Sequence, residues 1–447
     1  MIAEWWVILL VIFGALIVLL AIGMPVAFAF LTINVVGVFV FWNGFVGFNQ
    51  LVLSISKSVT HFSILPVPLF ILMGEVMFRS GIATKQMEVL DSWFGRVPGR
   101  LSLMAVGGGT MFATLTGSGM AGTAMLGKLL VPDMEARGYK KPMTLGPILG
   151  SGGLAIMIPP SALGVLLAAI GNFSVGAFLV AIIVPGLLMG VAYATYIIVR
   201  CMLQPDLAPA YDKPKQPLLP KIGNTLLYVF PLAAIVFLVI GLMFLGVATP
   251  TEAAALGGVG TFILAALYRG LSWSVITESL KSTLQTTVMM FMILTGSTAF
   301  GQILAITGAS AGLVELATSA EVGPTAIIVL MMLVLLVMGT FMEPLSIMML
   351  TLPIYLPIVQ NLDTGLFGDE AAIWFGAVML LNMQMATTSP PFGLNLFVMK
   401  GVAPKGTTMM DIYKAGLPFL GCDAVVLLAM VIFPPLVLWL PRMMGAN

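Results

Sequence analysis

The sequence contains very little charge, which excludes several classes of protein. Only 8% of its 447 residues are charged, 19 Lys+Arg against 18 Asp+Glu, whereas about 25% is typical of soluble domains. So few charges cannot build a water-facing surface, and intrinsic disorder requires low hydrophobicity and many charges. The net charge of +1 offers no general attraction to nucleic acid, so we expect no nucleic-acid partner.

Cysteine and histidine are almost absent as well. We expect Cys201 and Cys422 to be reduced packing residues and His61 to lie at an interface. One histidine and two cysteines cannot form a zinc or haem site by spacing, and catalytic triads that need histidine are excluded unless they use His61. No Gly-rich loop with a Lys-Ser/Thr pair is present, which argues against an ATP-driven pump. We predict neither an enzyme nor an organic cofactor.

Long hydrophobic segments dominate the sequence instead. Hydrophobic residues make up 60% of it, and its mean hydropathy is +1.11. The apolar runs predict an all-α integral membrane protein in a lipid bilayer. The N-terminal run is expected to be retained rather than cleaved as a signal peptide. Shorter amphipathic segments at 47–60 and 270–281 are expected to lie along the interface. The predicted spans are 5–22, 25–42, 64–80, 143–172, 174–199, 222–245, 253–268, 283–306, 373–399 and 415–440.

The basic residues suggest that one apolar segment enters the membrane and returns. The connectors 81–100 and 132–142 carry three Lys or Arg residues each, and both should be cytoplasmic. A single crossing by 103–131 would separate them, so this segment is predicted to be a re-entrant hairpin with its apex near Gly117 and Ser118. Two arms of about 13 residues would each reach only ~20 Å, short of the ~30 Å hydrocarbon core.

A second hairpin is predicted from the opposite side. Only acidic residues flank 325–358, so both flanks are expected to be external, with the apex near Met342-Glu343-Pro344. This topology leaves Lys57 and Arg442 outside, with the other basic residues on or near the cytoplasmic face. Both termini are expected outside.

Two similar stretches indicate an internal repeat. Residues 146–160 read GPILGSGGLAIMIPP and residues 377–391 read AVMLLNMQMATTSPP, each following a predicted hairpin. The opposite orientations of the halves predict an inverted-topology repeat, a plan used by secondary transporters. We expect the transport core to consist of a first repeat in 65–200, with hairpin 103–131 and broken helix 143–172, and a second, inverted repeat in 283–414, with hairpin 325–358 and broken helix 373–400. The other expected parts are N-terminal scaffold helices in 1–64, a cytoplasmic connector with scaffold helices and an interfacial arm in 201–282, and a C-terminal helix in 415–447.

The broken helices are suited to binding a cation. Na⁺ needs oxygen ligands, and in lipid these come from backbone carbonyls and hydroxyls where a helix is interrupted. Each Pro-Pro pair should unwind the residues before it, with each apex meeting the break of its own half. The expected cation ligands are Gly117, Ser118, Gly150, Ser151, Gly152, Gly153 and Pro159 in one half, and Gly339, Met342, Glu343, Ser346, Ala386, Thr387 and Pro390 in the other.

An anionic substrate is expected beside these cations. The helix N-termini at Ser161 and Phe392 should point their positive ends at it. The expected substrate-binding residues are Ser118, Ser161, Thr387, Thr388 and Asn395.

Residues 23–28, 66–74, 115–119, 158–161 and 389–395 carry a resemblance to a known family. In these segments the chain resembles the large membrane subunit of tripartite ATP-independent periplasmic (TRAP) transporters. The resemblance extends over essentially the whole chain. It implies an elevator-type secondary transporter, with a fold like the ion transporter superfamily, that takes up organic acids with two or more Na⁺ ions across the bacterial inner membrane. It also implies two partners, a small four-helix membrane subunit and a periplasmic substrate-binding protein, and carboxylate substrates such as C4-dicarboxylates, sialic acid or 2-oxo acids.

Other functions have to be weighed against Na⁺ symport. Glu343 lies in an apolar run, so a proton-coupled carboxylate transporter that uses this residue is the main alternative. An intramembrane enzyme would need a nucleophile with a base, and Ser118 has no obvious His or Lys partner. A channel would need a continuously open pore, whereas a transporter has a closed site that opens alternately to the two sides of the membrane.

Overall fold

The computed structural model describes residues 4–41, 45–93, 97–116, 119–209, 217–319, 322–340 and 342–444. Their regular elements are all helices, which confirms the predicted all-α class. Eight of the described helices are long and apolar enough to cross a membrane, or nine if the bent pair α8 and α9 counts as one span. The predicted multi-span membrane architecture is therefore supported.

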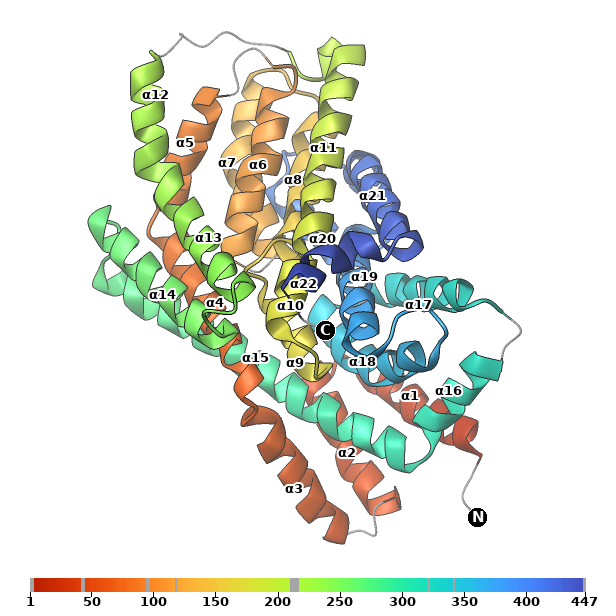
Figure 1. Ribbon diagram of the computed structural model, residues 1–447. Coiled ribbons are helices and arrows are strands. Elements are labelled where there is room, and N and C mark those ends of the chain that lie inside the picture. Colours follow the sequence, from red (N-terminus) through yellow and green to blue (C-terminus); the bar gives the residue numbers. More distant parts are fainter. Residues whose placement is uncertain are drawn as a thin grey trace.

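The helices of the first half and the middle of the chain follow one another with short breaks (Figure 1). Their bounds are α1 Trp5–Ala21, α2 Val26–Phe41, α3 Phe45–Val59, η1 Phe62–Ile64, α4 Pro66–Arg79, α5 Ile82–Trp93, α6 Arg100–Thr116, α7 Gly119–Ala136, α8 Lys141–Met157, α9 Ala162–Ile170, α10 Val175–Ala181, α11 Ile183–Leu203, η2 Pro205–Leu207, α12 Leu218–Asn224, η3 Thr225–Val229, α13 Phe230–Phe244 and α14 Pro250–Leu267.

The remaining helices include the longest one described. Their bounds are α15 Trp273–Ile306, α16 Ala309–Ser319, α17 Pro324–Gly339, α18 Pro344–Asn361, α19 Gly368–Thr388, α20 Leu394–Val402, α21 Met409–Ile432 and α22 Pro435–Met443. The predicted boundary between an interfacial segment at 270–281 and a span at 283–306 is wrong, because α15 runs through both without interruption.

Local sequence explains several helix starts. Thr249 and Glu252 form a reciprocal capping box at the start of α14, and Thr408 and Asp411 do the same for α21. The hydroxyl of Ser272 accepts the backbone N–H of Val275 at 3.2 Å, which fixes the beginning of α15. Such caps satisfy backbone amides that have no partner within the helix.

Both Pro-Pro pairs interrupt a helix, although later than we expected. Residues 158–161 separate α8 from α9 with a bend of 43°, and residues 389–393 separate α19 from α20. Pro159-Pro160 and Pro390-Pro391 are both cis peptides. The expectation that Gly150–Gly153 would be unwound is wrong: these residues lie inside continuous α8, because their carbonyls still find amide partners one turn later, before the prolines.

The predicted hairpin segments form pairs of adjacent helices, α6 with α7 and α17 with α18. Their arms are longer than we expected, since α6, α7, α17 and α18 have 17, 18, 16 and 18 residues. At 1.5 Å per residue such arms are about 25 Å long. These lengths come closer to the ~30 Å hydrocarbon core than expected, so the charge distribution becomes the main reason to expect re-entrant hairpins.

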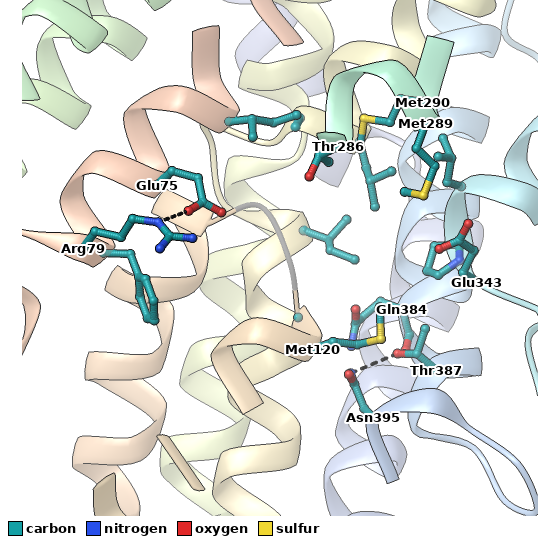
Figure 2. Close-up of a pocket in the computed structure, with 18 residues that line it drawn as sticks. Glu75, Arg79, Met120, Thr286, Met289, Met290, Glu343, Gln384, Thr387 and Asn395 are labelled. Atoms are coloured by element: carbon teal, nitrogen blue, oxygen red, sulfur yellow. Dashed lines mark hydrogen bonds and ion pairs between the residues drawn. The ribbon is translucent and has the colours of Figure 1, made fainter. Parts of the chain in front are cut away.

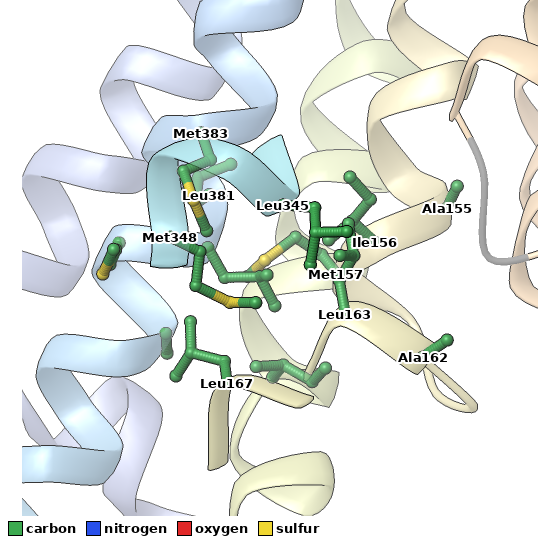
Figure 3. Packing of buried hydrophobic residues seen from close by; sticks show 14 of the residues in the cluster. Ala155, Ile156, Met157, Ala162, Leu163, Leu167, Leu345, Met348, Leu381 and Met383 are labelled. Atoms are coloured by element: carbon green, nitrogen blue, oxygen red, sulfur yellow. The ribbon is translucent and has the colours of Figure 1, made fainter. Parts of the chain in front are cut away.

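The two halves interlock in the centre of the molecule. Figure 3 shows Leu345 and Met348 of α18, from the second half, among side chains on either side of the α8–α9 break, including Met157 and Leu163. In Figure 1, α6, α7, α8 and α11 run side by side in one part of the structure, while α15 crosses beside α2, α3 and α4. The broken helices are thus enclosed by both hairpins, with α4 and α15 along one side.

Candidate functional site

A cavity of about 340 Å³ lies where the two hairpins, both broken helices and the helices α4 and α15 meet. Figure 2 shows Glu75 and Arg79 on one side of it and Glu343 on the other, with Gln384, Thr387 and Asn395 between them. The lining residues are Ile71, Glu75, Phe78, Arg79, Gly119, Met120, Ile156, Ala162, Leu163, Thr286, Met289, Met290, Glu343, Pro344, Leu345, Gln384, Thr387 and Asn395.

The Pro-Pro pairs leave backbone carbonyls without helical partners beside this cavity. In an α-helix, the carbonyl of residue i accepts the amide of residue i+4, and proline has no amide hydrogen. Pro159 and Pro160 therefore leave the carbonyls of Ala155 and Ile156 unpaired in the helical pattern, and Pro391 does the same for Thr387. These carbonyls, rather than those of Gly150–Gly153, are the oxygens that each break frees.

The tip of the first hairpin packs against both halves. A Cβ atom built on Gly152 would lie 2.6 Å from Thr123 Oγ1 and 3.0 Å from the carbonyl oxygen of Gly119. A Cβ atom on Gly119 would lie 3.5 Å from Asn395 Nδ2. The start of α7 therefore touches α8 of its own half and α20 of the other half, an approach that requires glycine at both positions.

Several buried polar atoms at this junction have no hydrogen-bond partner among the described residues. They are Thr123 Oγ1, Gln384 Nε2 and Asn395 Oδ1, while Asn395 Nδ2 donates to Thr387 Oγ1 at 3.2 Å. Buried polar groups are normally paired with protein atoms, water or a ligand. Two oxygens and one N–H donor without protein partners indicate a place built for a polar ligand, and oxygens are the ligands that hard cations prefer.

The tip of the second hairpin meets α19. A Cβ atom on Gly339 would lie 2.1 Å from the Cβ of Ala386, so the end of α17 and this part of α19 are in direct contact. Glu343 begins α18, and its Oε1 accepts a hydrogen bond from Ser346 Oγ at 3.3 Å. Met342, Glu343 and Ser346 also line a neighbouring cavity of about 820 Å³ beside α1, α2 and α15.

The opposite wall carries an ion-pair network between α4 and α15. Arg79 donates from Nε to Glu75 at 2.8 Å and from Nη1 to Glu278 at 2.7 Å. Ser282 donates from Oγ to the second carboxylate oxygen of Glu75 at 2.8 Å. The network joins the two helices and brings a guanidinium to the edge of the cavity.

The remaining residues predicted from the sequence lie nearby, but their polar atoms are already used. Ser161 caps α9 by accepting the amide of Gly164 at 3.1 Å, and Ser151 donates to the carbonyl of Ile148 at 2.8 Å. Thr388 donates to the carbonyl of Met385 at 3.0 Å, and Gly150 faces Phe419. Gly117 and Ser118 lie outside the described residues.

Sequence reasoning missed five polar residues of the site: Glu75, Arg79, Thr123, Thr286 and Gln384. A signal for the first pair was present, since a carboxylate and a guanidinium four residues apart in an apolar run lie on one helix face. Thr123 and Gln384 carried no signal, because isolated polar residues in apolar helices are recognisable as site residues only once their neighbours are known.

Comparison with known proteins places the chain in a family of transporters. The family model described as "Tripartite ATP-independent periplasmic transporter, DctM component" matches residues 13–436. The C4-dicarboxylate TRAP transporter large permease protein DctM of Pseudomonas aeruginosa is 30% identical over 89% of this chain and 91% of its own length. The isethionate TRAP transporter permease protein DctMQ of Oleidesulfovibrio alaskensis is 29% identical over 84% of this chain and 58% of its own.

A solved structure shares the fold. The YdaH transporter of Alcanivorax borkumensis aligns with a TM-score of 0.60 over 88% of each chain, at 13% identity. Because the family model covers nearly the whole chain, and the Pseudomonas relative aligns over most of it, the chain belongs to the family of large membrane subunits, or DctM components, of tripartite ATP-independent periplasmic transporters.

Proposed function

We propose that this chain carries out Na⁺-coupled uptake of an organic carboxylate across the bacterial inner membrane. A periplasmic binding protein delivers the substrate, and a small four-helix membrane subunit is the second partner. The named substrates of the two relatives, a C4-dicarboxylate and isethionate, are organic anions, which supports an anionic substrate here.

The observation that carries the proposal is the set of oxygens at the meeting point of hairpins and breaks. The carbonyls of Ile156 and Thr387 lack their helical amide partners, and Thr123 Oγ1 and Asn395 Oδ1 are buried without hydrogen bonds among the described residues. Oxygens of this kind suit Na⁺, and two symmetry-related breaks suggest two ions or more. The bound cations would in turn offset the charge of the carboxylate.

The arrangement of helices supports an elevator mechanism. In this proposal the hairpins enter the membrane from opposite sides and move, together with the broken helices, as one rigid core. The repeats predicted from the sequence include α4 and most of α15. However, α15 contacts α2, α3 and α4, and α4 and α15 line one wall of the cavity, so in this proposal both belong to the static scaffold with α1, α2 and α3. The methionines Met289 and Met290 on the scaffold side of the cavity supply flexible apolar contacts for such sliding.

The proposal is tested by reconstituting the chain with its small subunit and binding protein in liposomes. Uptake of a panel of radiolabelled acids, beginning with succinate and N-acetylneuraminate, is measured under an imposed Na⁺ gradient. We expect one acid to accumulate with the gradient and to stop accumulating when choline replaces Na⁺. Accumulation that does not depend on the Na⁺ gradient would exclude Na⁺ coupling.

Proton coupling through Glu343 is a second candidate. The carboxylate lines the cavity, and its partner among the described residues is the hydroxyl of Ser346, with no basic side chain within ion-pair distance. A carboxyl group in such surroundings can take up and release a proton as the core moves. Uptake that follows a pH gradient in the absence of Na⁺ would favour this mechanism.

A further inference from the structure

A second polar cavity, which we call the outer cavity, lies apart from the site described above. It has a volume of about 670 Å³ and is enclosed by α3 and α15 on one side and by α9 and α18 on the other. The predicted topology places it toward the external face, because Lys57 is one of the two basic residues expected outside. Its polar lining includes Ser54, Lys57, His61, Ser297, Gln302 and Gln360.

The wall formed by α3 is amphipathic, and its polar face lines the outer cavity. Ser54, Lys57 and Ser58 are spaced at i, i+3 and i+4, so they share one helix face, and that face lines the outer cavity. Val46 and Leu53 elsewhere on α3 are exposed. A helix that turns its polar face toward a cavity between helices, and its apolar side chains outward, indicates a polar ligand or a water-filled path there.

Two residues that line the outer cavity carry buried polar atoms without a hydrogen-bond partner among the described residues. Ser54 is only 4% exposed, and its hydroxyl has no hydrogen-bond partner among the described residues, nor does Oε1 of Gln302. A serine hydroxyl can donate to a carboxylate, and an amide oxygen can accept from a ligand hydroxyl or from water. The outer cavity therefore has donor and acceptor positions that the described part of the protein leaves open.

The charges of the two cavities differ in a way that favours an anion in the outer one. No aspartate or glutamate is among the described residues that line the outer cavity, and the ammonium of Lys57 has no carboxylate partner in that part of the chain. The cavity of about 340 Å³ between the two hairpins, which we call the inner cavity, is different, because its Arg79 is already paired with Glu75 and Glu278. A carboxylate entering the outer cavity meets an uncompensated positive charge.

The two cavities also lie along the same helix. Met290 of α15 lines the inner one and Gln302 lines the outer one, about three turns or roughly 18 Å farther along at 1.5 Å per residue. A core that slides along α15 by this distance would carry the hairpin tips from one cavity to the level of the other. The same helix would then provide the wall for both ends of the movement.

We propose that the outer cavity is the external receiving site for the carboxylate substrate, with Lys57 as its anion-binding residue and Ser54 as a hydrogen-bond donor. The inference rests on the proposed function. It adds a site and two residues that determine how the substrate is captured before the core moves.

The first experiment needs no substrate, so it separates this inference from the proposed function. Ser54→Cys is introduced into a C201S/C422S background, and the reconstituted complex is treated from outside with an anionic or a cationic methanethiosulfonate. We expect the anionic reagent to react with the thiol faster than the cationic reagent does. The K57Q substitution should lower the ratio of the anionic to the cationic reaction rate severalfold. The control R442Q removes the other external basic residue and should leave the ratio unchanged. A thiol that neither reagent reaches from outside, or a ratio insensitive to K57Q, would overturn the proposal.

The second experiment measures uptake of the acid found to be transported. We expect K57Q to raise the KM roughly tenfold, the order for losing a hydrogen bond to a charged group, with the maximal rate retained and with K57R restoring most of the affinity. An unchanged KM in K57Q would refute the role of Lys57. If the wild type accumulates no acid of the panel, the proposed function fails, and the labelling result still decides whether the cavity is an external anion site.

Discussion

Asn395 donates a hydrogen bond from Nδ2 to Oγ1 of Thr387 at 3.2 Å, and this bond joins α19 to α20 across their break. Oδ1 of the same asparagine is buried and has no partner among the described residues. One side chain thus holds the break in shape and keeps an oxygen free beside the tip of the first hairpin. This combination gives a direct test of the inner site.

Replacing Asn395 with alanine should remove both the bridge and the free oxygen. Losing a buried hydrogen-bonding group costs about 1–3 kcal/mol, so we expect kcat/KM for uptake to fall tenfold or more and the Na⁺ concentration for half-maximal uptake to rise. Both are measured in liposomes. Asn361→Ala is the control, because Asn361 is exposed and bonds only the carbonyl of Pro357 in its own helix. Equal activities for the two variants would show that Asn395 holds no ligand.

Arg79 gives a second prediction, which concerns charge. R79Q should leave Glu75 uncompensated at the edge of the cavity, and its repulsion of an anionic substrate should raise the KM severalfold. The double variant E75Q/R79Q removes that repulsion, so it should recover part of the lost affinity. R137Q is the control, since Arg137 pairs with Asp133 at the same i, i+4 spacing away from the cavity. A double variant no better than R79Q would mean that the guanidinium itself binds the substrate.

The sequence predicted the broken helices because proline acts locally. A Pro-Pro pair removes two amide donors wherever the chain folds, so Pro159-Pro160 and Pro390-Pro391 could be placed as breaks without knowledge of the tertiary structure. The error over Gly150–Gly153 has the same physical basis: proline disturbs the helix through the carbonyls four residues before it, so helical hydrogen bonding continues through the glycines. The freed carbonyls of Ala155 and Ile156 could have been derived from this spacing.

The rest of the site depends on contacts between residues far apart in the chain. Thr123, Gln384 and Asn395 come from three helices of two halves, and nothing in their sequence spacing brings them together. We predicted that each hairpin apex would meet the helix break of its own half. This prediction left out the interlocking of the halves, in which Leu345 of the second half packs beside the α8–α9 break of the first. Such pairings are set by how the two halves of the chain pack on each other, which local patterns do not encode.

Glu343 separates the two coupling mechanisms. E343Q keeps the size and hydrogen-bonding capacity of the side chain but removes its ability to carry a proton. If carbonyl and hydroxyl oxygens bind the coupling Na⁺, we expect the E343Q variant to retain uptake driven by Na⁺, with at most a modest change in the KM for the substrate. Abolished uptake in E343Q, together with wild-type uptake driven by a pH gradient alone, would establish the proton mechanism.

Gly339 tests whether the second hairpin must approach α19 closely. A methyl group at this position would lie 2.1 Å from the Cβ of Ala386, an atom that cannot move without the backbone of α19. G339A should therefore push the hairpin away from the break, lowering the melting temperature of the purified complex and its uptake rate, with a stability loss of about 1–3 kcal/mol, as for overpacked cores. Gly190→Ala in α11 is the matched control, because a Cβ there meets nothing within 4 Å. Alanine is the better helix former, so G190A should keep or raise the melting temperature. If G339A behaved like G190A, the tip of the second hairpin would not need this contact, and the ion site proposed beside Ala386 would lose its structural basis.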